Sequence, residues 1–492
     1  SAIVPNLYSS NPGDGRNVTS IRGITTTSYD PAVATYIDGV NQFGLDTYIS
    51  SLFDVERIEV LRGPQGTLYG RNAMGGVINI ITKKPANYTT GFAGVDIGNY
   101  GQQRYSAGMR TALIKDKLFF GAAGLVNRQS GFYTNEFNNK KYDRLHGYLG
   151  NYYLKFQGSA KFDLTLNVKN NENSNDGTLP LVASVEGALS NPFKVNQNTL
   201  TTMFDNLFNA SLSANYAGDG FNFTSQSAYQ SNYRYYDKPI DSDFSPIDGI
   251  SLINNYGKDW NKIQVLTQEF KFSSPSSSDS RFKWVGGVYG FYQKNPVKQG
   301  LSFGEDAELV ESLPGLSILS VNNGKSFGLA AFGQVSYAIT DELSVTAGLR
   351  YDYEHKKQGV YGEMLMPGET QPIVEQKDTS ATASFKALSP KVSLAYSFVP
   401  DHSFYATYSR GFRAGGLTQI GSDRTAKPLV AYKPEYGNNL EFGSKNTFFD
   451  QRLSVNVAAF YVRLTDAQVP VLILPDAITI TRNAGKLSSK GV

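Results

Sequence analysis

The chain has 492 residues, with 46 lysines and arginines against 43 aspartates and glutamates, and its net charge of +3 excludes the strongly basic surface typical of nucleic-acid binding. It contains no cysteine, which excludes disulfide frameworks, thiol catalysis and zinc–thiolate sites. Glycine (48), tyrosine (31) and phenylalanine (30) are abundant, whereas no apolar run approaches the roughly 18 residues of a membrane-spanning helix. If the chain crosses a membrane, it does so as a β-barrel.

Residues 1–87 form the first predicted unit, a small αβ domain. Short, mostly apolar segments at 34–40 and 55–62 are followed by a glycine cluster and a predicted strand at 76–82. The glycines permit tight turns and close approach of the backbone. A phosphate-binding loop is excluded at this cluster, because no Gly-Lys-Ser/Thr sequence follows it and no helix is predicted to begin there.

From about residue 90 onward the chain alternates apolar and polar residues in runs of ten or more. In 343–354, the odd positions are apolar or aromatic and the even positions are small, polar or charged. A period of two places these two sets on opposite faces of one strand. The runs 162–168 and 453–461 repeat the pattern, and each run is long enough for a tilted strand to cross a bilayer.

The connectors between these runs alternate in length. Tight turns are predicted at 115–116, 158–161, 218–220, 340–341, 400–401 and 450–451. Long polar loops are predicted at 172–203, 236–261, 295–325, 355–381, 413–433 and 465–477. This asymmetry is typical of an outer-membrane barrel whose long loops face outward. The alternative is a soluble β-sandwich or propeller, which also has period-two strands and aromatic residues.

Several motifs resemble the TonB-dependent outer-membrane receptor family. In the first unit these are Ile21-Arg22-Gly23, Tyr36-Ile37-Asp38-Gly39-Val40 and the run 55–85. Later in the chain they are Tyr432-Lys433-Pro434-Glu435, Leu440-Glu441-Phe442-Gly443 and Asn483-Ala484-Gly485-Lys486. The layout is most similar to ferric-siderophore receptors of the yersiniabactin/pesticin receptor type. The resemblance covers essentially the whole chain, with the motifs in the expected order.

The resemblance implies an all-β fold, a transmembrane antiparallel β-barrel with an N-terminal αβ plug domain inside its lumen. The plug comprises residues 1–87 and the barrel residues 88–492 in this prediction. Barrels of the family have 22 strands, whereas about 16 alternating runs are present here. We therefore expect that the first part of the plug with its TonB box, and the C-terminal strands, are missing from this chain, because an open strand edge in lipid leaves backbone groups unsatisfied.

The resemblance also implies an active transporter of the bacterial outer membrane that is not an enzyme. It would bind a ferric siderophore outside the cell and import it with inner-membrane proton-motive energy delivered through TonB. No resident cofactor or metal is expected, because the iron is part of the chelated substrate. Further expected partners are outer-membrane lipid and lipopolysaccharide, with a phage or bacteriocin as an additional candidate and no nucleic acid. Two alternatives stay open: an importer of cobalamin, haem or an oligosaccharide, and a passive porin.

By the same resemblance, two plug arginines, Arg22 and Arg62, pair with glutamates of the barrel wall. Glu441 matches the position of one of these glutamates, and the second would follow Val492. A guanidinium in a plug that is packed inside a polar lumen needs a carboxylate partner. The pairs are predicted to form a lock that holds the plug to the wall and releases during energised transport.

Ligand capture is predicted for the outward loops and the outward tips of the plug, because flat, anionic ferric chelates suit aromatic stacking and cationic pairing. The predicted ligand-binding residues are Asn41, Gln42, Phe43, Tyr233, Arg234, Tyr235, Tyr236, Trp260, Tyr292, Phe303, Arg410, Phe412 and Arg413. The alternative is that the aromatic residues form an interfacial girdle and the nearby cations meet lipopolysaccharide. A haem receptor would need a histidine on the plug, and the plug segment has none.

Overall fold

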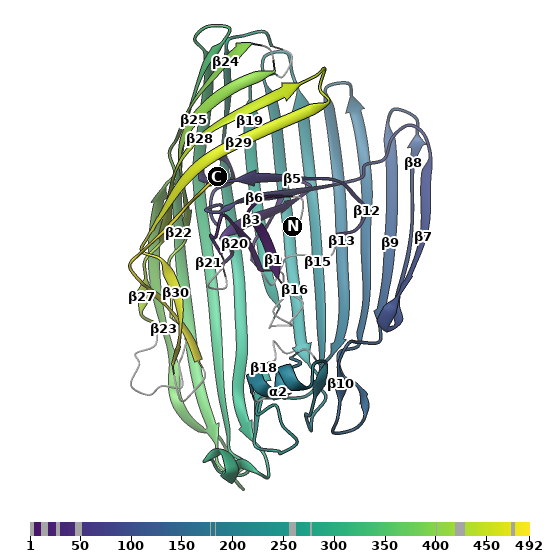
Figure 1. Ribbon diagram of the computed structural model, residues 1–492, viewed down its shortest axis with the longest axis vertical. Coiled ribbons are helices and arrows are strands. Elements are labelled where there is room, and N and C mark those ends of the chain that lie inside the picture. Colours follow the sequence, from purple (N-terminus) through teal and green to yellow (C-terminus); the bar gives the residue numbers. More distant parts are fainter. Residues whose placement is uncertain are drawn as a thin grey trace.

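The computed structural model describes residues 4–10, 18–25, 30–44, 52–177, 179–182, 184–254, 262–275, 278–399, 401–418, 429–473 and 478–492. Most of this chain is antiparallel strand, arranged as a curved wall around a small inner domain (Figure 1). Within these residues, no helix has the length and apolar character needed to cross a membrane.

The wall is one sheet of the barrel, and its strands follow one another in chain order. They are β7 (Thr90–Gly98), β8 (Gln102–Ile114), β9 (Leu118–Gln129), β12 (Leu145–Ser159), β13 (Phe162–Asp176), β15 (Thr202–Ala217), β16 (Asn222–Tyr236), β17 (Ile240–Asp241), β18 (Ile250–Asn254), β19 (Ile263–Ser273), β20 (Phe282–Phe303), β21 (Ser317–Ala338), β22 (Leu343–Leu365), β23 (Ile373–Leu388), β24 (Lys391–Val399), β25 (His402–Arg413), β28 (Glu435–Phe448), β29 (Leu453–Thr465) and β32 (Lys486–Gly491).

Short elements lie at the ends of this wall. They are β10 (Thr134–Asn135), β11 (Lys140–Lys141), β14 (Lys194–Val195), β26 (Gly416–Leu417), β27 (Ala431–Tyr432), β30 (Gln468–Ile473), β31 (Ile478–Asn483), the helix α2 (Val185–Ser190) and the 3₁₀ turns η2 (Asn99–Gly101) and η4 (Ala307–Val310).

Some of the wall elements are parts of one interrupted strand. β23 and β24 pair with successive stretches of the same neighbour, β22. In the same way, β18 and β19 pair with successive stretches of β20. β16 and β17 also form one strand, because β16 pairs with β19 and β17 pairs with β18. Counted in this way, the wall has about 16 strands, which agrees with the number of alternating runs in the sequence.

The alternation of the sequence separates the two faces of the wall. On β22, Arg350, Asp352 and Glu354 are buried against the inner domain, whereas Leu349 and Tyr351 are exposed on the outer surface. Successive side chains of a strand point to opposite faces, so the lumen is polar and the outer face is apolar.

Two of the predicted long loops are mostly strand. β20 and β21 stay paired as far as Ser302 and Ser317, inside the predicted loop 295–325. β22 and β23 likewise extend through most of the predicted loop 355–381. These stretches carry polar residues on both faces, so their composition resembles that of a loop although most of their backbone is paired.

The inner domain is the predicted plug. It contains β1 (Leu7–Ser10), β2 (Val18–Ile21), β3 (Val33–Ile37), β4 (Val40–Gln42), β5 (Val55–Arg62), the helix α1 (Gly66–Tyr69) and β6 (Gly76–Thr82). Four of the strands form a mixed sheet in the order β4-β3-β6-β5, with β3 and β6 parallel. Buried apolar residues of this sheet, such as Ile37 and Ile80, pack directly against Leu149 of the wall.

Candidate functional site

The two ends of the wall differ in their connections. At one end, the links 115–117 between β8 and β9, 160–161 between β12 and β13, and 339–342 between β21 and β22 are short turns. At the other end, β13 and β15 are separated by 177–201 and β25 and β28 by 414–434. In outer-membrane barrels the short turns face the periplasm, so the end with the long connections is the outer end.

A polar hollow, which we call the vestibule, lies on the outer side of the plug. Its lining includes Asp30 and Gly44 from the plug and Gln293, Asn295, Ser326, Lys356 and Gln358 from β20, β21 and β22. The hollow is open to solvent. Its mixture of amide, hydroxyl and charged groups suits a small polar chelate.

The floor of the vestibule carries a buried network of charges. The Asp30 carboxylate accepts a hydrogen bond from Arg71 at 2.9 Å and lies 3.7 Å from the ammonium of Lys356. Burial alone would raise the pKa of Asp30, but the positive charges of Arg71, Lys356 and Arg413 outweigh burial and hold this pKa below its usual value. Asp30 is therefore ionised at neutral pH, and Lys356 is the cation of the network that lines the open space.

Arg71 is the centre of this network, and the sequence did not single it out. Its side chain is only 3% exposed, and it lies 3.5 Å from a carboxylate oxygen of Glu354. Its guanidinium also stacks over the rings of Phe43, at 4.4 Å, and Phe291, at 5.3 Å. It joins the plug to β20 and β22 through partners that are distant in sequence, and no local pattern reveals such partners.

A second set of contacts joins the plug to β28. Arg22 donates to Glu441 at 2.6 Å, and the other oxygen of this carboxylate accepts from the hydroxyl of Tyr405 at 2.7 Å. The Arg22 guanidinium also lies 4.2 Å from the centre of the Phe460 ring. The structure thus brings two residues of the predicted lock together. The third, Arg62, is partly buried on β5 and makes no ion pair within the described part of the chain.

Gly63 is packed closely against the Arg22–Glu441 ion pair. Its φ is +82°, and a Cβ atom would lie 2.9 Å from a guanidinium nitrogen of Arg22 and 3.5 Å from Glu441. Gly63→Ala is expected to destabilise the plug by about 2 kcal/mol, from the left-handed backbone and from displacement of Arg22. Gly39→Ala is the matched control, because Gly39 has the same φ but its nearest neighbour would be 3.6 Å away. Thermal unfolding that shifts equally for both variants would contradict the crowding at Gly63.

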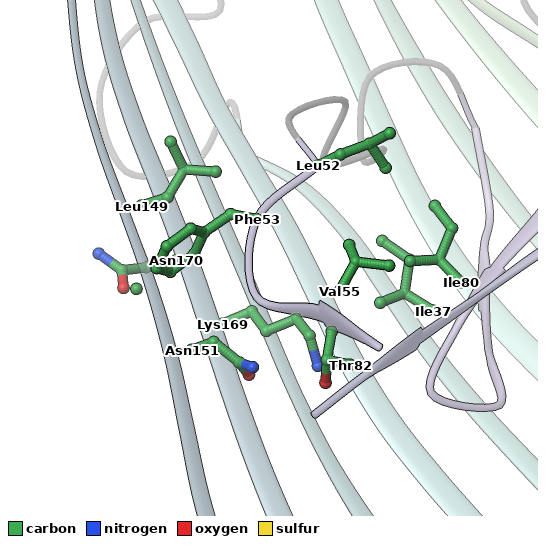
Figure 2. Close-up of a pocket in the computed structure, with 11 residues that line it drawn as sticks. Ile37, Leu52, Phe53, Val55, Ile80, Thr82, Leu149, Asn151, Lys169 and Asn170 are labelled. Carbon is green, nitrogen blue, oxygen red and sulfur yellow. The ribbon is translucent and has the colours of Figure 1, made fainter. Parts of the chain in front are cut away.

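A third set of contacts joins the plug to β12 and β13. Asp38 accepts hydrogen bonds from Lys169 at 2.6 Å, Tyr153 at 2.7 Å and the hydroxyl of Thr82 at 2.7 Å. Figure 2 shows Thr82, Asn151 and Lys169 beside the apolar residues that line a small pocket between plug and wall. Asp38 belongs to a motif noted in the sequence, but its role as an anchor was not predicted.

The family follows from a comparison along the whole chain. The TonB-dependent receptor plug domain matches residues 1–77, and the TonB-dependent receptor-like β-barrel matches residues 84–492. The chain belongs to the TonB-dependent receptor family. The predicted family, the plugged β-barrel fold and the outer-membrane location are thereby confirmed.

Individual relatives are similar along most of this receptor. The pesticin receptor of Yersinia enterocolitica is 26% identical over 505 residues, which cover 100% of this chain and 68% of the relative. The solved ferric yersiniabactin uptake receptor FyuA from Yersinia pestis has a TM-score of 0.82 at 20% identity, with 99% of this chain and 71% of that chain covered. The ferric-catecholate import receptor Fiu from E. coli has a TM-score of 0.69 at 18% identity, with 99% and 72% covered.

The predicted ligand-binding residues of β16 lie on both faces of the receptor wall. Arg234 faces the lumen, is 3% exposed and pairs with Asp205 at 2.8 Å. Tyr233 and Tyr235 therefore point to the opposite face, where their rings lie 5.2 Å apart. The structure does not bring these two tyrosines into the lumen, and the alternation of the sequence already contained this information.

The same alternation separates Tyr292 from the plug. Its neighbour Phe291 faces inward and packs against Phe43, with ring centres 4.6 Å apart, whereas Tyr292 is exposed on the outer face. Asn41, Gln42 and Phe43 of the plug are buried against the wall. Of the three, Phe43 lies beneath the vestibule floor, where the Arg71 guanidinium stacks over its ring.

The remaining predicted residues lie near the outer end. Arg413 is buried, ion-paired with Glu435 and within 3.4 Å of the backbone carbonyl of Asp30. Arg410 stacks over the Tyr436 ring at 4.2 Å. Phe412 is part of β25 and is buried with Ala387 and Ala414. Phe303 and Tyr236 end β20 and β16, and Trp260 lies outside the described residues. Of these residues, Arg413 comes closest to the vestibule.

Proposed function

We propose that this receptor binds a ferric siderophore in the vestibule and imports it with energy delivered through TonB. The observation that carries the proposal is the vestibule itself, an open hollow lined by amide and hydroxyl groups and the Lys356 ammonium, on the outer side of a plug. Its lining suits an anionic chelate with many oxygen atoms. The relatives named for pesticin, ferric yersiniabactin and ferric catecholates support the same substrate class.

In this proposal the receptor binds the ferric chelate and moves it across the membrane. Iron enters as part of the substrate, so the protein needs no resident metal or cofactor for this role. The plug has one state that binds the chelate from outside and one that releases it inside, and TonB supplies the energy that converts the first into the second. A bacteriocin is a further proposed partner, because one relative is named for pesticin.

The alternative cargoes differ in the side chains that they require. Haem would need an axial ligand, and the structure points His355 to the outer face, where it bonds Ser384 at 2.9 Å. His146 lies beside Arg128, and His402 lies at a short turn against Phe448. These positions favour a chelate that brings all of its own iron ligands. A passive porin is disfavoured, because the plug sheet packs directly against the wall.

The proposal is tested by quenching of the intrinsic tyrosine and tryptophan fluorescence in the full-length receptor. The panel comprises ferric phenolate, catecholate and hydroxamate siderophores with their iron-free forms, haem, cobalamin and oligosaccharides. Saturable quenching by a ferric chelate, without quenching by its iron-free form, is the expected result. A response to haem, cobalamin or a sugar alone would overturn the siderophore assignment and retain the transporter.

Lys356→Gln is expected to weaken binding of an anionic ferric chelate about tenfold, equivalent to about 1.4 kcal/mol for one charge-assisted contact. Lys356 faces the vestibule, with its ammonium 3.7 Å from Asp30. Lys161→Gln is the matched control, since it removes the same charge from an exposed lysine at the short-turn end of the wall, away from the vestibule lining. Equal losses of affinity in the two variants would show that the chelate does not bind at the vestibule side chains.

A further inference from the structure

On the outward face of β20, β21 and β22, apolar residues give way to lysines at the same level of the three strands. On β21, every second residue from Tyr337 to Phe327 is apolar or glycine, and the next outward residue is Lys325. On β20 and β22, the outward residues are likewise apolar, aromatic or glycine, and the next outward residues are Lys294 and Lys357. All three lysines are exposed.

The register of the sheet places these lysines side by side. Lys294 is paired directly with Lys325, and Lys325 is paired directly with Lys357. Directly opposed residues have Cβ atoms about 4.5–5.5 Å apart, and like charges at this spacing destabilise a sheet. We call these three residues the lysine row.

By the alternation of the strands, the side chains of the lysine row lie on the outward face, although Lys325 and Lys357 also border the vestibule. Phe291 and Ser326, which are buried, occupy the inward positions of β20 and β21, and Tyr292 and Phe327 on the lysines' face are exposed. Within the described residues, no carboxylate forms an ion pair with any member of the row, although Lys356, on the inward face, approaches Asp30. The described part of the chain therefore places no carboxylate in an ion pair with these three adjacent positive charges.

An aromatic row locates these charges relative to the membrane. Tyr292, Phe327 and His355 are direct cross-strand neighbours, and the rings of Phe327 and His355 lie 5.5 Å apart. Aromatic residues of this kind mark the interface at the edge of the apolar band. The lysine row lies two residues further toward the outer end, about 7 Å along the strands, and so at the level of the lipid headgroups.

We propose that the lysine row is a binding site for the phosphate groups of a lipopolysaccharide in the outer leaflet. A phosphorylated glycolipid provides closely spaced anions at this height, and its acyl chains would cover the apolar outward residues of β20, β21 and β22. Ammonium–phosphate contacts would replace the repulsion within the row by charge-assisted hydrogen bonds. The inference rests on the outer-membrane location and not on the identity of the imported solute.

The test compares full-length receptors purified in mild detergent from outer membranes. The variant Lys294→Gln, Lys325→Gln, Lys357→Gln is compared with the wild type and with Lys115→Gln, Lys117→Gln, Lys161→Gln. The control removes the same charge from exposed lysines at the short-turn end. Bound lipid A is measured by mass spectrometry of its hydroxy fatty acids, and an unchanged thermal unfolding midpoint shows that each variant is folded.

The row variant is expected to carry at least fivefold less lipid A than the wild type, with the control unchanged. Rebinding of purified lipid A to the stripped wild type is expected to weaken as salt is raised and to fail for dephosphorylated lipid A. Equal lipid A on the row variant and the control would overturn the proposal. Displacement of the lipid by millimolar inorganic phosphate would also overturn it, since the row would then be a site for the free anion.

Discussion

Arg22→Ala is expected to destabilise attachment of the plug to the wall by about 3 kcal/mol, because it leaves the Glu441 carboxylate without its cation. The Arg22 and Glu441 side chains are only 3% and 12% exposed, so water cannot replace the lost partner fully. Local opening of the plug becomes correspondingly easier. Hydrogen exchange of the backbone amides in 55–85, followed by mass spectrometry, is expected to accelerate about 100-fold.

The control for this prediction is Arg57→Ala on β5. Arg57 pairs with Glu59 at 2.7 Å, but its side chain is 53% exposed, and an exposed pair of this kind contributes little. A second comparison uses Arg22→Met together with Glu441→Gln, which removes both charges and is expected to restore part of the lost protection. Unchanged exchange in Arg22→Ala would show that the contact does not hold the plug.

The wall of this receptor could be predicted from the sequence because one face of each strand meets lipid and the other meets a polar lumen. That contrast fixes the alternation, and a slip of one residue would exchange the faces. The alternation weakens where strands leave the apolar band, so 295–325 and 355–381 were predicted as loops although they are mostly strand.

The charged contacts between plug and wall, unlike the strands, could not be predicted from a local sequence pattern. Asp38 and Lys169 are 131 residues apart, and Asp30 and Glu354 share the guanidinium of Arg71 as an ion-pair partner. Their partners are set by the position of the plug in the lumen, which no local periodicity encodes. Arg22 and Glu441 could be paired in advance only through the resemblance to a family.

The faces on which the aromatic residues of β16 lie could have been predicted from the sequence. The sequence contained enough information to separate Tyr233 and Tyr235 from Arg234, because alternate residues of one strand cannot share a face. A cluster of aromatic and basic residues at a strand end therefore has to be divided by parity before it is assigned to a ligand site. The inward members then belong to the lumen, and the outward members belong to the lipid interface.

Asp38→Asn is expected to destabilise the contact between the plug and β12–β13 by about 3 kcal/mol, because it leaves the ammonium of Lys169 buried without a counter-charge. Both side chains of this pair are 8% exposed. The control is Asp219→Asn, which breaks a 2.6 Å pair with Lys161 at a short turn where Asp219 is 90% exposed and the expected change is close to zero. The measurement is calorimetric unfolding of the full-length receptor in detergent.

The pH dependence of this difference gives an independent check. Burial alone would raise the pKa of Asp38, but the Lys169 ammonium and the hydrogen bonds from Thr82 and Tyr153 outweigh burial and lower it. A carboxyl group whose folded pKa is depressed stabilises the folded state above its unfolded pKa of about 3.9 and loses that contribution as the pH falls through the lower folded value. The gap in stability between the wild type and Asp38→Asn is therefore expected to be constant from pH 8 to about pH 5 and to shrink below about pH 4. A gap that stays the same at about pH 3 would show that the charge of Asp38 does not anchor the plug.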